Sequence, residues 1–167
     1  MRLIKLALLS FIFLFLLVTI ISLFIPGEIK ISKAINIAND DTSTFAMIND
    51  LRQWRLWHPA LKDMDENEII AEADNIKVRN TKISVIKRGS NELLTEIATT
   101  NGQPVESQIR FIHHQKGDSA TLQWYMQFHL RWYPWEKFKS LFYENIYGVQ
   151  MEQGLANLKA ISLARRS

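Results

Sequence analysis

Hydrophobic residues follow three patterns along this chain, and each pattern predicts a different kind of element. The first is an unbroken run of twenty uncharged residues from Leu6 to Ile25, in which only Ser10, Thr19 and Ser22 are polar. At 1.5 Å per residue, a helix of this length covers about 30 Å, the thickness of the hydrocarbon core of a bilayer. The run therefore predicts one transmembrane helix.

A cleaved secretory signal is the main alternative to a membrane anchor. Signals have a shorter apolar core and end at a small-residue cleavage site, whereas this run ends at Pro26 and Gly27 without an Ala-x-Ala-like pattern. We therefore expect residues 1–27 to form an uncleaved anchor and residues 28–167 to form one domain.

Basic residues on both sides of the span bear on its orientation. Arg2 and Lys5 precede it and predict a cytoplasmic N-terminus, because positive charge favours the cytoplasmic side. The protein would then be a single-pass protein of the cytoplasmic membrane, with its domain in the periplasm or another extracytoplasmic space. Lys30 and Lys33 follow the span and favour the opposite orientation.

The second pattern is period-two alternation, which is typical of half-buried strands. It occurs in residues 29–37 and, most clearly, from Thr121 to Trp132. In that longest predicted strand the apolar residues all share one face: Leu122, Trp124, Met126, Phe128, Leu130 and Trp132. Turn signals at 88–91, 101–102 and 116–118 divide residues 69–132 into about five strands, and a change of parity predicts a bulge or turn near Asn80.

The third pattern is helical spacing. Polar residues 39–43 can cap a helix that carries Phe45 and Ile48, and a second short piece carries Trp54 and Trp57. After Pro134, apolar residues predict a long amphipathic helix over residues 137–163, bent or broken near Gly148. An antiparallel sheet with helices on one face belongs to the α+β class, and a curved sheet around the last helix would leave a cavity.

The amino-acid composition excludes several kinds of binding partner and chemistry. The formal charge of +3 includes Arg2 and Lys5, so the domain is nearly neutral and nothing predicts nucleic-acid binding. The absence of cysteine excludes disulfides and thiol chemistry. The acidic stretch 63–68 lacks the oxygen order and glycine of a calcium loop, and adjacent His113 and His114 would point to opposite faces of a strand. We therefore expect no metal and no cofactor.

Three segments together resemble the START/polyketide-cyclase-like superfamily (helix-grip, birch-pollen-allergen-like fold), especially small bacterial members with an N-terminal membrane helix. They are the opening strand 31–37 followed by Phe45, the spaced Trp54 and Trp57 before Pro59, and Trp124 followed by 134–159 with Gly148. The resemblance implies a curved antiparallel sheet wrapped round a long C-terminal helix. Residues 75–90 depart from the family, because they contain Gly89 but no tryptophan.

The resemblance implies three alternative functions: binding of a hydrophobic small molecule or lipid, which we favour, a protein-interaction module like the chaperone activators, and a cyclase- or dehydratase-like enzyme. No motif marks catalytic residues; His113 with Glu96 or Glu106 is the only acid–base pair that we consider. The expected ligand-cavity residues are large and apolar: Trp54, Trp57, Trp124, Met126, Phe128 and Leu130.

Aromatic residues also gather between the last strand and the last helix, at Trp132, Tyr133 and Trp135. They either staple the start of the helix or touch the membrane interface, where tryptophan and tyrosine partition well. We assign them to the membrane interface as a hypothesis. The sequence identifies no protein partner.

Overall fold

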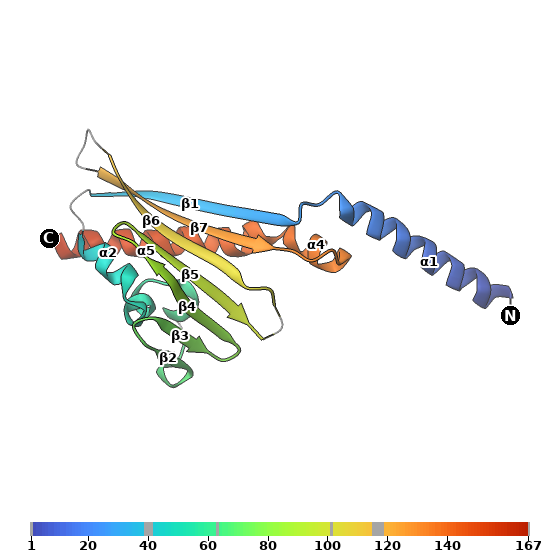
Figure 1. Ribbon diagram of the computed structural model, residues 1–167, viewed down its shortest axis with the longest axis horizontal. Helices are drawn as coiled ribbons and strands as arrows, with labels where there is room; N and C mark the ends of the chain where they lie inside the picture. Colours follow the sequence, from blue (N-terminus) through green and yellow to red (C-terminus); the bar gives the residue numbers. More distant parts are fainter. Residues whose placement is uncertain (1, 39–41, 63, 101, 115–118, 167) are drawn as a thin grey trace.

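A computed structural model describes residues 2–38, 42–62, 64–100, 102–114 and 119–166, and it confirms the predicted α+β class (Figure 1). An apolar helix, α1 (Arg2–Leu23), precedes a seven-stranded antiparallel sheet with the order β1-β7-β6-β5-β4-β3-β2. The strands are β1 (Glu28–Ala38), β2 (Ile69–Ala71), β3 (Asn75–Val78), β4 (Thr81–Arg88), β5 (Glu92–Thr99), β6 (Val105–His113) and β7 (Ser119–His129).

Helices cover the inner face of the sheet. Those between β1 and β2 are α2 (Thr42–Asn49), the 3-10 helix η1 (Leu51–Leu56), α3 (Pro59–Lys62) and the 3-10 turn η2 (Glu66–Glu68). Those after β7 are α4 (Pro134–Ser140), the π-helical turn η3 (Glu144–Gly148) and α5 (Val149–Arg166). Helix α5 lies along β1 and also contacts β7, α2 and α3, which gives the helix-grip arrangement (Figure 1).

The period-two pattern of β7 fixes which side chains face the helices. Leu122, Trp124, Met126 and Phe128 are buried on the inner face. The strand ends at His129, so the prediction that it continues to Trp132 is wrong. Beyond the paired residues of β1 and β7, the Leu130 amide donates one more hydrogen bond, to the Gly27 carbonyl, at 2.8 Å.

The predicted long C-terminal helix is confirmed: the π-helical turn η3 runs directly into α5, and α4 precedes them after a turn at 141–142. The predicted break near Gly148 takes the form of this π-helical turn, which ends at Gly148. A Cβ at Gly148 would lie 2.9 Å from Glu144 Oε1 and 3.1 Å from Lys33 Cε. The Lys33 ammonium bridges Glu144 and Glu152 at 2.7 Å each. A side chain from β1 therefore holds the π-helical turn.

The remaining predictions from the sequence concern turns between the elements. The parity change near Asn80 is a turn in which Arg79 has φ 49°, and the register shift lies later, between Val85 and Lys87. The hairpin predicted at 88–91 joins β4 to β5. The predicted turns at 101–102 and 116–118, the capping residues 39–41 and the start of the acidic stretch 63–68 lie wholly or partly outside the described residues.

Candidate functional site

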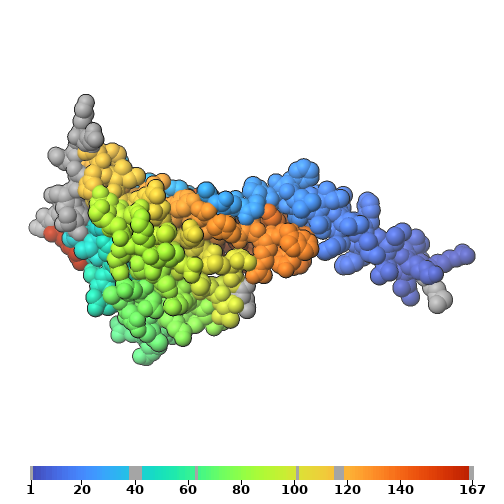
Figure 2. Space-filling model, in the orientation of Figure 1, coloured from blue at the N-terminus to red at the C-terminus, as the bar shows by residue number. Residues whose placement is uncertain are grey.

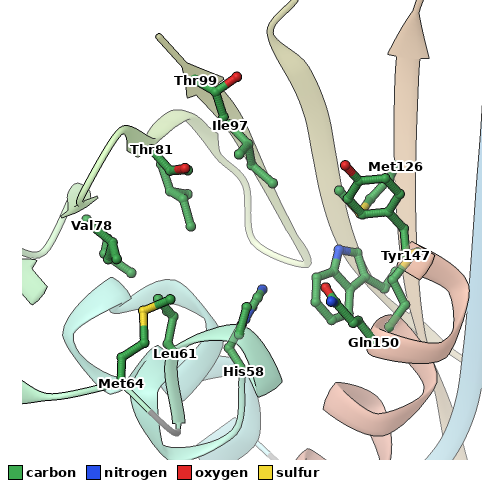
Figure 3. A pocket seen from close by; sticks show the side chains of 15 residues that line it. His58, Leu61, Met64, Val78, Thr81, Ile97, Thr99, Met126, Tyr147 and Gln150 are labelled. Atoms are coloured by element: carbon green, nitrogen blue, oxygen red, sulfur yellow. The ribbon is translucent and has the colours of Figure 1, made fainter. Parts of the chain in front are cut away.

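An apolar cavity of about 250 Å³ lies between the inner face of the sheet and its helical cover (Figure 3). Strands β3, β4, β5 and β7 form one wall, and the segment around α3, η3 and α5 forms the other. The lining residues are His58, Ala60, Leu61, Met64, Ile76, Val78, Thr81, Ile83, Ile97, Thr99, Trp124, Met126, Tyr147, Gln150 and Met151.

A buried aromatic cluster lies against the closed end of this cavity. The rings of Trp57 and Trp124 meet edge to face with 5.5 Å between centroids, and Trp54 lies 5.1 Å from Trp57. Two indoles satisfy their N–H groups: Trp54 donates to the Ile48 carbonyl at 2.8 Å and Trp124 to Ser107 Oγ at 2.9 Å. Because these contacts fix the indoles, they supply a rigid base for the cavity.

Asp50 sets the start of η1, which carries Trp54 and ends just before Trp57. Its carboxylate accepts the Arg52 amide at 3.1 Å and pairs with the Arg52 guanidinium at 2.9 Å. These bonds lower the pKa of Asp50 to about 2. In a 3-10 helix residues three apart lie on one side, so Trp54 and the following Trp57 both face the core.

Gly154 brings α5 against the same cluster. A Cβ at this position would lie 2.8 Å from Trp124 Cζ3 and 3.2 Å from Pro59 Cδ. Neither atom belongs to a flexible chain end, so a side chain here would push α5 away from the sheet. The close approach of α5 therefore depends on glycine at this position.

His58 is the polar member of the cluster. Its ring stacks on Trp54, with centroids 5.5 Å apart and planes 7° from parallel, and meets Trp124 edge to face at 5.3 Å. Burial lowers the pKa of His58 to about 4, so the imidazole is neutral at pH 7. Within the described residues, His58 Nδ1 and Trp57 Nε1 are buried without a hydrogen-bond partner.

A second cavity, also of about 250 Å³, adjoins the first. The two share Ile97, Thr99, Met126 and Tyr147 in their linings. The second one is more polar and adds residues from the end of β7, from the β5–β6 connection and from α4: Gly102, Gln103, Pro104, Val105, Phe128, His129, Leu130, Glu136, Lys139 and Tyr143. It therefore extends the apolar cavity toward α4, the helix that contacts α1.

The structure distributes the six expected cavity residues over three places. Trp124 and Met126 line the first cavity, and Met126, Phe128 and Leu130 line the second. Trp54 and Trp57 are 1% and 0% exposed and lie behind the lining.

Several lining residues were not anticipated from the sequence. Leu61 and Met64 come from the short segment after Pro59, Tyr147 from the π-helical turn, and Gln150 from the start of α5. Helical apolar spacing marks the positions of some of these residues. It does not show that they meet β3 and β4 across a cavity.

The aromatic segment after β7 lies close to the end of α1. Trp132 and Trp135 are 63% and 62% exposed, and Tyr133 stacks on Trp135 with centroids 4.9 Å apart. Lys137 in α4 donates to the Ile25 carbonyl at 2.9 Å. Figure 2 shows α1 projecting from the body of the molecule, with the orange segment that contains α4 at its base.

The fold does not bring His113 together with Glu96 or Glu106, the acid–base pair that we considered. His113 lies at the opposite end of β6 from Glu106, seven residues or about 23 Å along the strand, and Glu96 pairs with Glu106. This separation contradicts the acid–base pair that we considered. Within the part of the chain that the structure describes, no three His, Asp or Glu side chains are grouped to hold a metal ion.

Comparison with solved structures shows that the chain has the START/polyketide-cyclase-like fold. A START superfamily protein from Mycobacterium smegmatis matches 81% of this chain and 97% of its own, with 15% identity and a TM-score of 0.55. Norcoclaurine synthase from Thalictrum flavum, in complex with a transition-state analogue, matches 84% and 97%, with 10% identity and a TM-score of 0.58.

A third match is the di-domain ARO/CYC StfQ from the steffimycin biosynthetic pathway, with 7% identity and a TM-score of 0.63. It covers 83% of this chain and 52% of StfQ. No sequence-family model and no curated protein matches the chain. At these identities the similarity establishes the fold, and the function has to be argued from the site itself.

Proposed function

We propose that this START/polyketide-cyclase-like fold is a membrane-tethered domain that binds a hydrophobic small molecule or lipid between its sheet and C-terminal helix. The observation that carries the proposal is the pair of adjoining cavities, each of about 250 Å³, on the inner face of the sheet. Small-molecule sites are concave, mostly apolar and of a few hundred cubic ångströms, with a few polar groups. Trp124, Met126, Phe128 and Leu130 are the expected cavity residues that supply its apolar lining.

The proposed tether is residues 1–27, and the proposed binding domain is residues 28–167. Helix α1 has 22 residues, and its most apolar stretch of 18 residues has a mean hydropathy of 2.9, so its length and composition suit a membrane span. Two of its hydroxyl groups are satisfied within the helix, because Thr19 donates to the Phe15 carbonyl and Ser22 to the Thr19 carbonyl. The charges of Arg2 and Lys5 favour a cytoplasmic N-terminus and an extracytoplasmic domain in the cytoplasmic membrane.

We further propose that Trp132, Tyr133 and Trp135 lie in the headgroup region. Lys137 of α4 donates to the carbonyl of Ile25, two residues after the end of α1, and α4 also contacts α1, so a membrane-spanning α1 would bring this aromatic segment close to the bilayer surface. Two largely exposed tryptophans cost less free energy there than in water. Because α4 also lines the second cavity, a ligand could pass between bilayer and cavity over a short distance.

Native mass spectrometry of the full chain, released from mild detergent, tests ligand binding. A cavity-filling variant, Ala60→Trp, distinguishes molecules in the cavity from lipids bound to α1, because Ala60 is an exposed residue that lines the first cavity. Ile70→Trp, at an exposed position outside the cavity, is the matched control.

A bound mass carried by the wild type and by Ile70→Trp, but lost from Ala60→Trp, is the expected result. If all three proteins carry the same masses, or none, the cavity is not a ligand site. The protein-interaction module would then be the better account of the domain.

A further inference from the structure

His58 differs from every other residue that lines the first cavity. Of the lining side chains it is the one that is both polar and buried, with 7% exposure, and the remaining polar ones, such as Thr81 and Gln150, are more exposed. Figure 3 shows the imidazole directed into the cavity from the start of α3. A buried polar ring therefore borders a mostly apolar space.

Packing alone does not account for a histidine at this position. A phenyl ring could stack on Trp54 and meet Trp124 in the same way. It would also avoid the free-energy cost of a buried ring nitrogen without a hydrogen bond, which applies to Nδ1. Because Nδ1 is buried from the cavity as well, a ligand oxygen could reach the ring only at Nε2, which donates or accepts a hydrogen bond according to the tautomer.

The charge of the lining limits the kind of ligand. None of the fifteen lining residues is Asp, Glu, Lys or Arg. A carboxylate, phosphate or ammonium group beside His58 would lose its water without gaining a counter-ion, which is strongly unfavourable. An uncharged hydroxyl or carbonyl group needs only a hydrogen bond.

We propose that His58 is the specificity-determining residue of the cavity, and that its ligand is an uncharged, elongated apolar molecule with a hydroxyl or carbonyl oxygen at the end that enters first. This inference rests on the proposed ligand-binding function and names the ligand class. The apolar body lies against Leu61, Met126 and Met151, and the far end reaches toward the second cavity.

The test compares 1-decanol, decane and decyl sulfate, each radiolabelled, on the full chain in lipid nanodiscs. Nanodiscs that carry Ala60→Trp provide the background for partition into lipid. We expect decanol to bind about tenfold more tightly than decane, the effect of one neutral hydrogen bond, and decyl sulfate to show no specific binding. In His58→Phe the ratio of the affinities for decanol and decane falls to about one. In His58→Gln, which keeps a hydrogen-bond donor and an acceptor, the preference for decanol returns.

Each outcome decides between two conclusions. Specific binding without a preference for decanol, or a preference that survives in His58→Phe, overturns the inference and leaves the cavity as a ligand site. Equal signals from wild type and Ala60→Trp for all three probes overturn the proposed function, and this inference with it. Specific decane binding by His58→Phe on the same sample shows that this variant keeps a folded, open cavity.

Discussion

Lowering the pH from 7.5 to 4.5 is expected to destabilise the domain through His58. Burial lowers the pKa of His58 from 6.5 to about 4. Between these values the unfolded chain binds a proton that the folded chain does not, so the stability is complete above pH 6.5 and is lost as the pH falls toward 4. The shift of the pKa corresponds to about 3 kcal/mol in full, most of which is lost by pH 4.5.

Urea unfolding of the full chain in maltoside micelles, followed by tryptophan fluorescence, measures this loss. Trp54, Trp57 and Trp124 are buried and report on the core. With a urea dependence of about 1–3 kcal/mol per molar, the midpoint should fall by about 1–2 M between the two pH values. His58→Phe should remove most of this fall, because a phenyl ring cannot take up the proton.

The exposed His114 provides the matched control, and His114→Gln should keep the full pH dependence. Equal midpoints at pH 7.5 and 4.5 in the wild type would refute the argument. An equal fall in the wild type and His58→Phe would attribute the loss to carboxyl groups instead.

Three further predictions concern packing, capping and the membrane. Gly154→Val should lower the free energy of unfolding by about 1–3 kcal/mol in urea titrations, because its side chain would clash with Trp124. Asp50→Ala should lower it by about 1 kcal/mol through loss of the η1 cap, an effect present above pH 3.8 and lost toward pH 2, where the carboxyl group becomes protonated. In vesicles of lipids brominated near the headgroup, replacing Trp132 and Trp135 with Phe should remove most of the fluorescence quenching, because α1 contains no tryptophan.

Each of these predictions has a control within the chain. Ala156 lies on the exposed side of α5, so Ala156→Val should leave the free energy of unfolding nearly unchanged. Asp65→Ala removes an N-cap residue whose side chain makes no capping bond and should cost less than Asp50→Ala. Trp124→Phe should leave the quenching in place. The packing argument would be contradicted if Ala156→Val lowered the free energy of unfolding as much as Gly154→Val. The capping argument would be contradicted if Asp50→Ala and Asp65→Ala cost the same free energy. The membrane argument would be contradicted if the fluorescence quenching survived without Trp132 and Trp135.

The sequence predicted the elements whose pattern is local. The inner face of β7 followed from alternation, because successive strand residues point to opposite faces. The break at Gly148 also followed from a local signal. The form of that break did not, because the π-helical turn is bridged by Lys33, a residue 115 positions earlier in the chain.

The cavity was harder to predict for the same reason. Trp54 and Trp57 have the size and apolarity of lining residues, but those properties do not show whether an indole ends at open space or at another indole. Their contacts depend on the distance between α5 and the sheet, which Gly154 helps to set. His58 was visible in the sequence only as the residue before Pro59, and its role depends on the surrounding rings.

The pairing of β1 with β7 has a consequence for how the chain acquires its structure. Ser32 and Gln123, which meet across these strands, are 91 residues apart. The first strand after α1 therefore lacks this partner until residue 129 of the 167 has been synthesised, and closing so large a loop slows folding. If α1 spans a bilayer as we propose, the apolar face of β1 stays uncovered beside that bilayer until β7 has reached the same side of the membrane.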